Sequence, residues 1–233
     1  MDTVTTRLIA ERRFYVGAAI GVVVIVLAGF SIDVDLLRDM SSLSALVRVH
    51  GLVMFGWIAL FVTQTVLVAR HRVDLHRRLG IFGALLAAVI VIADTATALV
   101  AFRLGGHHLP PGMPAPLFLA FALFDLLTFA ILVSGAIALR RRSDWHKRLM
   151  LLGVIMVLDA ALARFISVYT SWGLDPGIAR DALVLLCVVI DTLRYRRLHP
   201  AFLLGGLLVF VTDPLAGWVA ALPVWARLCA WLA

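Results

Sequence analysis

Charged residues and cysteines are both scarce in this chain, and their scarcity excludes several classes of protein. Only 15% of the residues are Asp, Glu, Lys or Arg, and the two cysteines are Cys187 and Cys229. Two isolated thiols build neither a disulfide framework nor a CxxC site, so we expect both to be small buried structural residues. The sequence also contains no Walker, Rossmann, GxSxG or HExxH motif, so the common signatures of nucleotide-binding proteins and hydrolases are missing.

Apolar residues dominate instead, and they occur in long runs. They make up 63% of the 233 residues, and the mean hydropathy is +1.02. A soluble domain of this length cannot bury so much apolar surface. Crossing a bilayer takes about 20 apolar residues. The chain is therefore predicted to be an all-α polytopic membrane helix bundle, one transmembrane domain over residues 1–233. The seven predicted transmembrane helices are 14–31, 43–69, 79–103, 115–139, 149–171, 178–194 and 201–220, followed by an interfacial tail at 221–233.

The basic residues are distributed unevenly between the predicted connections. Fifteen of the 21 Lys and Arg residues lie before the first predicted helix or in the turns after the second, fourth and sixth. The positive-inside rule then places the N-terminus in the cytoplasm and the C-terminus outside, in a bacterial inner membrane. We expect these residues to meet the anionic lipids of the inner leaflet. A net charge of +7 that is split into short clusters does not indicate a nucleic-acid partner.

Two of the basic turns share a sequence motif. The pattern D-x-H-[RK]-R-L-x-x-x-G occurs at 74–83 and again 70 residues later at 144–153, with a looser third version at 196–200. Such repetition predicts three similar hairpins after the first helix, with their turns on one membrane face. The residues of this cytoplasmic turn motif are Asp74, His76, Arg77, Arg78, Asp144, His146, Lys147, Arg148 and His199.

Two interpretations of the turn motif remain open. In the first, Asp74 and Asp144 are N-caps, Pro200 opens a helix, and the basic residues anchor to lipid at about 1 kcal/mol per charge. In the second, the motif histidines gather as metal ligands or bind a lipid phosphate. No close ligand spacing such as HxxxH supports the second interpretation.

The repeated segments resemble those of a known bacterial family. They are H-G…Q…L-H-R-R-L-G at 50–80, D-W-H-K-R-L-M…A-L-A-R at 144–164, and R-R-L-H-P-A at 196–201. Together they are similar to a family of seven-helix bacterial membrane proteins described only as domains of unknown function. The resemblance covers roughly residues 45–205 and implies this fold, but it implies no activity.

Ionisable residues inside the predicted spans are the strongest functional signal. An acid near a helix centre costs about 2.5–3.5 kcal/mol on insertion scales, so it normally faces a partner or water. We expect a shared interior pocket in which Arg164 contacts at least one of the acids. Pro214 is expected to kink the last span and to turn Asp213 inward. The predicted pocket residues are His50, Asp94, Asp125, Asp159, Arg164 and Asp213.

Three functions fit these residues. The first is binding or transport of a small ligand or ion by the pocket. The second is a haem- or metal-binding redox or oxidase-assembly protein that uses His50, His107 and His108 as metal ligands. The third is a zinc-dependent membrane hydrolase, although a second closely spaced histidine pair on one helix is missing. An enzyme is the less favoured interpretation, no cofactor is specified, and structural salt bridges alone would explain part of the pattern.

Overall fold

A computed structural model describes residues 3–31, 44–105, 109–110, 112–169 and 174–233, with the backbone alone for 3–10. Within these ranges the chain forms nine helices and no strand, so the all-α prediction is confirmed. The helices are α1 (Thr3–Phe30), α3 (Ala45–Ala69), α4 (Val73–Leu104), α5 (Ala115–Ala138), α6 (Ser143–Met156), α7 (Asp159–Tyr169), α8 (Pro176–Tyr195), α9 (Pro200–Ala220) and α10 (Pro223–Leu232).

Several helices are long and apolar enough to cross a membrane. In the described part of the chain they are α1 from Glu11 onward, α3, α4, α5 and α9, and the bent pair of α6 and α7 adds a sixth if it forms one span. The predicted helix at 178–194 exists as α8, but it does not qualify by composition. Four charged residues interrupt its apolar sequence: Arg180, Asp181, Asp191 and Arg194.

The predicted single helix over 149–171 was wrong in one respect. It is divided into α6 and α7, which are bent by 48°. The backbone tightens at the break, because Val157 and Leu158 donate to carbonyls only three residues back, at 3.3 and 3.0 Å. α7 then starts with Asp159, so the break decides the direction in which this carboxylate points.

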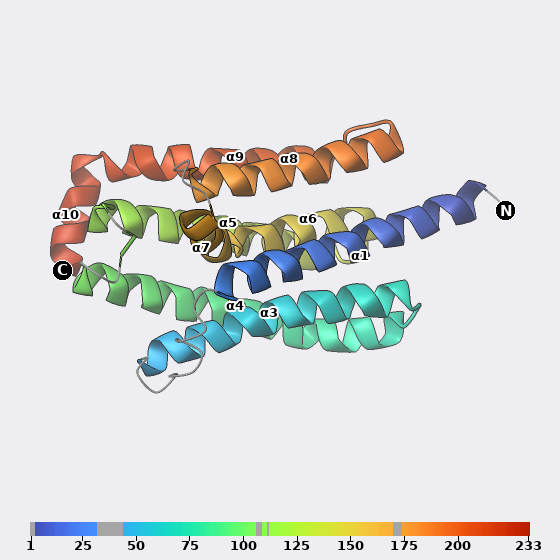
Figure 1. The fold of residues 1–233 in the computed structure, drawn as a ribbon, viewed down its shortest axis with the longest axis horizontal. Coiled ribbons are helices and arrows are strands. Elements are labelled where there is room, and N and C mark those ends of the chain that lie inside the picture. Colours follow the sequence, from blue (N-terminus) through green and yellow to red (C-terminus); the bar gives the residue numbers. More distant parts are fainter. Residues whose placement is uncertain (1–2, 32–43, 106–108, 111, 170–173) are drawn as a thin grey trace.

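The three short turns lie at one end of the bundle. Figure 1 shows the α3–α4, α5–α6 and α8–α9 turns at the end where the N-terminus lies, while α10 and the C-terminus lie at the other. The predicted N-caps of α4 and α6, Asp74 and Asp144, were each wrong by two residues. Arg72 and Arg142 occupy those positions, and Asp74 and Asp144 lie in the first turn, where a negative charge still favours the helix dipole.

The third turn has a different cap. Pro200 opens α9 as expected, and His199 precedes it as the N-cap, with its Nδ1 accepting from the N–H of Ala201 at 3.1 Å. An imidazole nitrogen can therefore take the capping role that the sequence analysis assigned to aspartates in the other turns.

The predicted tail also contains structure. α10 packs against α5 through Trp225, which is buried and donates from its indole nitrogen to the carbonyl of Pro116 at 2.9 Å. Trp231 is exposed. Only one of these two tryptophans is therefore available to a membrane interface.

An ion pair is buried near the basic end of the bundle. The guanidinium of Arg148 on α6 donates to both carboxylate oxygens of Asp191 on α8, at 2.8–3.0 Å, and both side chains are 3% exposed. Arg148 also donates to the carbonyl of Asp144 at 2.8 Å. This bidentate pair fastens α8 to the rest of the bundle.

We predict that Arg148→Met destabilises the fold by about 3–5 kcal/mol, because it leaves the carboxylate of Asp191 buried without a counter-ion. The double variant Arg148→Met/Asp191→Leu should recover part of that loss. Thermal unfolding in detergent, followed by circular dichroism, measures both. A double variant less stable than the single one would contradict the argument.

Candidate functional site

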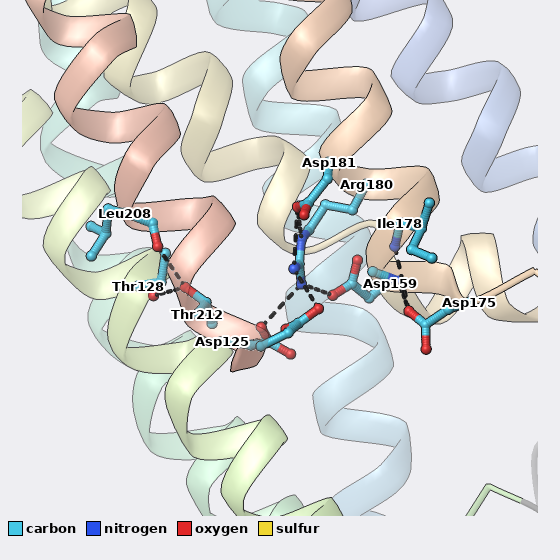
Figure 2. Close-up of polar contacts among 11 residues, drawn as sticks. Asp125, Thr128, Asp159, Asp175, Ile178, Arg180, Asp181, Leu208 and Thr212 are labelled. Carbon is cyan, nitrogen blue, oxygen red and sulfur yellow. Dashed lines mark hydrogen bonds and ion pairs between the residues drawn. The ribbon is translucent and has the colours of Figure 1, made fainter. Parts of the chain in front are cut away.

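The centre of the site is one arginine on α8. The side chain of Arg180 is 1% exposed, and its guanidinium contacts carboxylates from three other helices. Its Nη1 donates to Asp159 Oδ2 at 2.7 Å and to Asp125 Oδ1 at 3.2 Å, while its Nη2 donates to Asp213 Oδ2 at 2.8 Å (Figure 2). The planar fork of an arginine suits such simultaneous contacts, which a lysine ammonium does not reproduce.

A fourth carboxylate adds to the negative charge. Asp181 lies next to Arg180 in α8, with its Oδ1 3.4 Å from Nε (Figure 2). Four carboxylates thus surround one guanidinium. The second oxygen of Asp159 is buried and accepts no hydrogen bond from the described residues. The site therefore has more acceptor capacity and more negative charge than Arg180 satisfies.

The residues at the start of α8 position Arg180 in the site. Asp175 is the N-cap, and its Oδ1 accepts from the N–H groups of Gly177 and Ile178 at 2.7 and 3.4 Å. Pro176 is the first helical residue, where its missing N–H costs nothing. Arg180 follows one turn later. A Cβ added to Gly177 would collide with Asp213 Oδ2, so the carboxylate packs directly on the glycine.

Two buried threonines support the carboxylates on α5 and α9. The hydroxyls of Thr128 and Thr212 are 2.7 Å apart, and Thr212 also donates to the carbonyl of Leu208 at 2.8 Å (Figure 2). They lie one turn from Asp125 and next to Asp213, respectively. The inward direction predicted for Asp213 is confirmed. α9 continues through Pro214 as one helix, and the kink stays a prediction.

A packed apolar layer lies between the site and the basic end of the bundle. The four carboxylate side chains are 26–33% exposed, in contrast to Arg180. Towards the basic end, an apolar layer fills the space along α5, α6 and α9. Its buried residues are Leu132, Leu149, Leu152, Phe202 and Val209. A Cβ on Gly205 would meet Leu152 Cδ1 at 2.5 Å, so this layer is tightly packed.

The predicted pocket is in fact two separate sets of contacts. His50 Nδ1 lies 2.7 Å from Asp94 Oδ1, which joins α3 to α4. Both side chains are partly exposed, and among the described residues no hydrogen bond or ion pair links either of them to the Arg180 cluster. The sequence grouped Asp94 with the other acids by depth alone, whereas the contact depends on which face each helix turns inward.

The arginine that Asp125, Asp159 and Asp213 contact is Arg180, and the predicted contact of Arg164 with an acid stays a prediction. Arg164 Nη1 donates to the carbonyl of Ala160 at 3.1 Å, and the Arg164 guanidinium lies 4.6 Å from the ring centroid of Phe30 on α1. Arg164 and Asp159 are both on α7, five residues apart.

Arg180 is absent from the predicted pocket residues, although the sequence contains a signal for it. Arg180 falls inside the predicted span 178–194, next to Asp181, in a chain whose predicted spans contain more acids than bases. Which side of α8 faces the acids depends on the packing of α8 against α7 and α9.

The described residues give little support to the predictions of a haem- or metal-binding redox protein and of a zinc-dependent hydrolase. No three His, Cys, Asp or Glu side chains among them come close enough together to hold a metal ion. His107 and His108 lie outside the described residues, and His50 is paired with Asp94. On α3, Trp57 and Phe61 are ordinary core residues, with Trp57 in edge contact with Phe129 at 5.4 Å.

The turn motif forms a polar network at the basic end. Its side-chain contacts are Asp144 with His199 at 3.0 Å, Lys147 with Glu11 at 2.5 Å, and Arg148 with Asp191. Tyr195 also donates to Glu11, so α1, α6 and α8 meet here. A cavity of about 180 Å³ adjoins these residues. In the first copy of the motif, Asp74 is exposed and lies 3.6 Å from Arg72.

Gly177→Ala should separate Asp213 from Arg180, because its Cβ needs the space of the carboxylate. We expect a loss of about 1–3 kcal/mol, as for other overpacked positions. Gly217→Ala in α9 is the matched control. No atom lies within 4 Å of its added Cβ, so helix propensity should leave it neutral or up to about 1 kcal/mol more stable. Equal melting temperatures for the two variants would contradict this geometry.

Comparison with known proteins finds no family model, no curated protein and no solved structure that matches the chain. The family resemblance of the turn motifs therefore stays a prediction, and the function has to be inferred from the site itself.

Proposed function

We propose that this protein binds a small ion at the Arg180 cluster and transports it across a bacterial inner membrane in a proton-linked manner. The cluster consists of Arg180 with Asp125, Asp159, Asp181 and Asp213. In this proposal seven helices cross the bilayer, with the N-terminus in the cytoplasm and the C-terminus outside.

The excess of acid over base carries the proposal. Four carboxylates face one guanidinium, so three negative charges remain unbalanced if all four are ionised. Within a bilayer each such charge costs about 2.5–3.5 kcal/mol on insertion scales. Bound protons or a bound cation remove this cost. A purely structural salt bridge would not need more carboxylates than the guanidinium can neutralise. The unpartnered oxygen of Asp159 offers a position for either.

The spacing within the cluster favours a small ion. Guanidinium and carboxylates already approach to 2.7–3.2 Å, so an organic molecule has no space between them. A proton or an inorganic cation needs only a lone pair and a modest rotation of one carboxylate.

Transport is favoured by the packed layer between the cluster and the basic end. The carboxylates are partly exposed, while packed leucines, Phe202 and Val209 close the path towards the basic end. An ion that enters the cluster from one side therefore needs a rearrangement to leave on the other. Alternating exposure of one fixed central site is the usual solution in membrane transporters.

The burial pattern of α8 supports a seventh span. Its charges Arg180 and Asp191 are buried against the bundle, whereas Leu185, Leu186 and Leu193 are exposed. A helix that buries two of its four charged side chains and exposes leucines suits contact with lipid, although its average composition is too polar for a simple span.

The orientation rests on the basic end of the bundle. The three short turns lie there together, and their arginines interact favourably with anionic inner-leaflet lipids.

We predict that a reporter fused after Ala233 reads as periplasmic and one inserted within 140–143 reads as cytoplasmic. The opposite pair of readings would reject this orientation.

Ion transport is tested with purified protein in liposomes that enclose a pH-sensitive dye. With a membrane potential imposed, we expect wild-type protein to change the internal pH faster than empty liposomes do. Asp125→Asn and Asp159→Asn should each lower that rate at least tenfold, because each removes an ionisable oxygen from the cluster.

Asp74→Asn is the matched control, since it changes an exposed aspartate at the basic end and leaves the cluster intact. Its rate should equal the wild-type rate. Folded Asp125→Asn and Asp159→Asn proteins with wild-type rates, or wild-type protein no faster than empty liposomes across a series of alkali cations, would overturn the proposal.

A further inference from the structure

Two histidines from the repeated turn motif meet at the basic end of the bundle. His76 near the start of α4 and His146 near the start of α6 hold equivalent positions in the two copies, 70 residues apart. Their ring centroids are 6.1 Å apart, with the planes at 82°. The repeat therefore brings two imidazoles together from separate hairpins, and the Arg180 cluster does not involve either of them.

The protonation of His146 follows from its hydrogen bond. Its Nδ1 lies 2.8 Å from the carbonyl of Ala136 on α5. A carbonyl only accepts, so Nδ1 carries a proton, and in the neutral imidazole Nε2 then has the free lone pair. A histidine held in this way by a backbone carbonyl has the orientation and tautomer of a typical metal ligand.

Two further lone pairs, on His76 and on Gln64 next to it, are buried without partners among the described residues. Gln64 on α3 donates from Nε2 to the carbonyl of His76 at 3.2 Å, which leaves its Oε1 as an acceptor. Both Gln64 Oε1 and His76 Nδ1 are buried and have no hydrogen-bond partner among the described residues. Leaving a buried acceptor unsatisfied costs about 1–3 kcal/mol, so such groups normally indicate a bound water or ion.

We propose that His76, His146 and Gln64 bind one first-row divalent cation of the Zn²⁺ type. The ligands are His76 Nδ1, His146 Nε2 and Gln64 Oε1, and water completes the coordination. Imidazole nitrogen suits Zn²⁺, Cu²⁺ and Ni²⁺. With Zn–N bonds of about 2.0–2.1 Å, two imidazoles on one tetrahedral ion have centroids roughly 5 Å apart. The observed 6.1 Å therefore needs only a small movement of the rings.

The charges near the site permit a cation. Of the neighbouring bases in the motif, Lys147 is paired with Glu11 and Arg148 with Asp191. Arg77 is exposed, and so is Arg78, so water and salt screen both.

The proposal is tested on the full-length protein in detergent after chelation and dialysis. A His107→Ala/His108→Ala background removes the histidine pair outside the described residues. Zn²⁺ is then titrated against a chromophoric chelator. We expect one tightly bound Zn²⁺ per chain and a rise in melting temperature on binding.

Two ligand variants locate the site. His76→Gln and His146→Asn should each weaken Zn²⁺ binding at least tenfold and abolish the rise in melting temperature. In His146→Asn the amide nitrogen can still donate to the carbonyl of Ala136, so the helix contact is kept while the Nε2 lone pair is lost. Equal melting temperatures of the metal-free proteins check that both variants fold.

His71→Ala is the matched control, because His71 is an exposed histidine of the neighbouring turn that contacts Arg12. It should bind Zn²⁺ as the background protein does. The proposal is overturned if the background protein binds no Zn²⁺, which would assign the lone pairs to water, or if both ligand variants bind it unchanged. Neither outcome depends on ion transport by the Arg180 cluster.

Discussion

The buried guanidinium of Arg180 is the constraint on which the middle of the bundle depends. An arginine cannot give up its proton in a protein, so its charge has to be matched where it lies. The matching carboxylates come from α5, α7 and α9, and each of these helices must approach one planar group within hydrogen-bond distance. The break between α6 and α7 and the contact of Gly177 with Asp213 both serve that approach.

The charges of α8 connect two levels of the bundle. Arg180 near its start belongs to the acidic cluster, and Asp191 near its end forms the buried pair with Arg148. A tightly packed apolar layer lies between the two levels. A movement of α8 would therefore disturb both sets of ion pairs, so this helix is well placed to couple the central site to the basic end.

The repeated turns have taken different roles despite their shared sequence. His199 caps α9 and contacts Asp144, and His146 is held by the carbonyl of Ala136. His76 keeps a buried nitrogen without a partner. The same residue type thus acts in a helix cap, in a fixed side-chain contact and in a candidate ligand position, because each hairpin packs against different neighbours.

The sequence by itself determined the helical class, most helix boundaries and which acids lie inside the apolar segments. These features can be read from the local order of apolar and charged residues. The sequence also placed Asp125, Asp159 and Asp213 in one site. The tertiary structure alone decided that Arg180 joins them, and that Asp94 pairs with His50. Depth along a helix can be counted from sequence, but the direction of a side chain depends on helix rotation and on the 48° bend before Asp159. Both are set by packing between segments far apart in the chain.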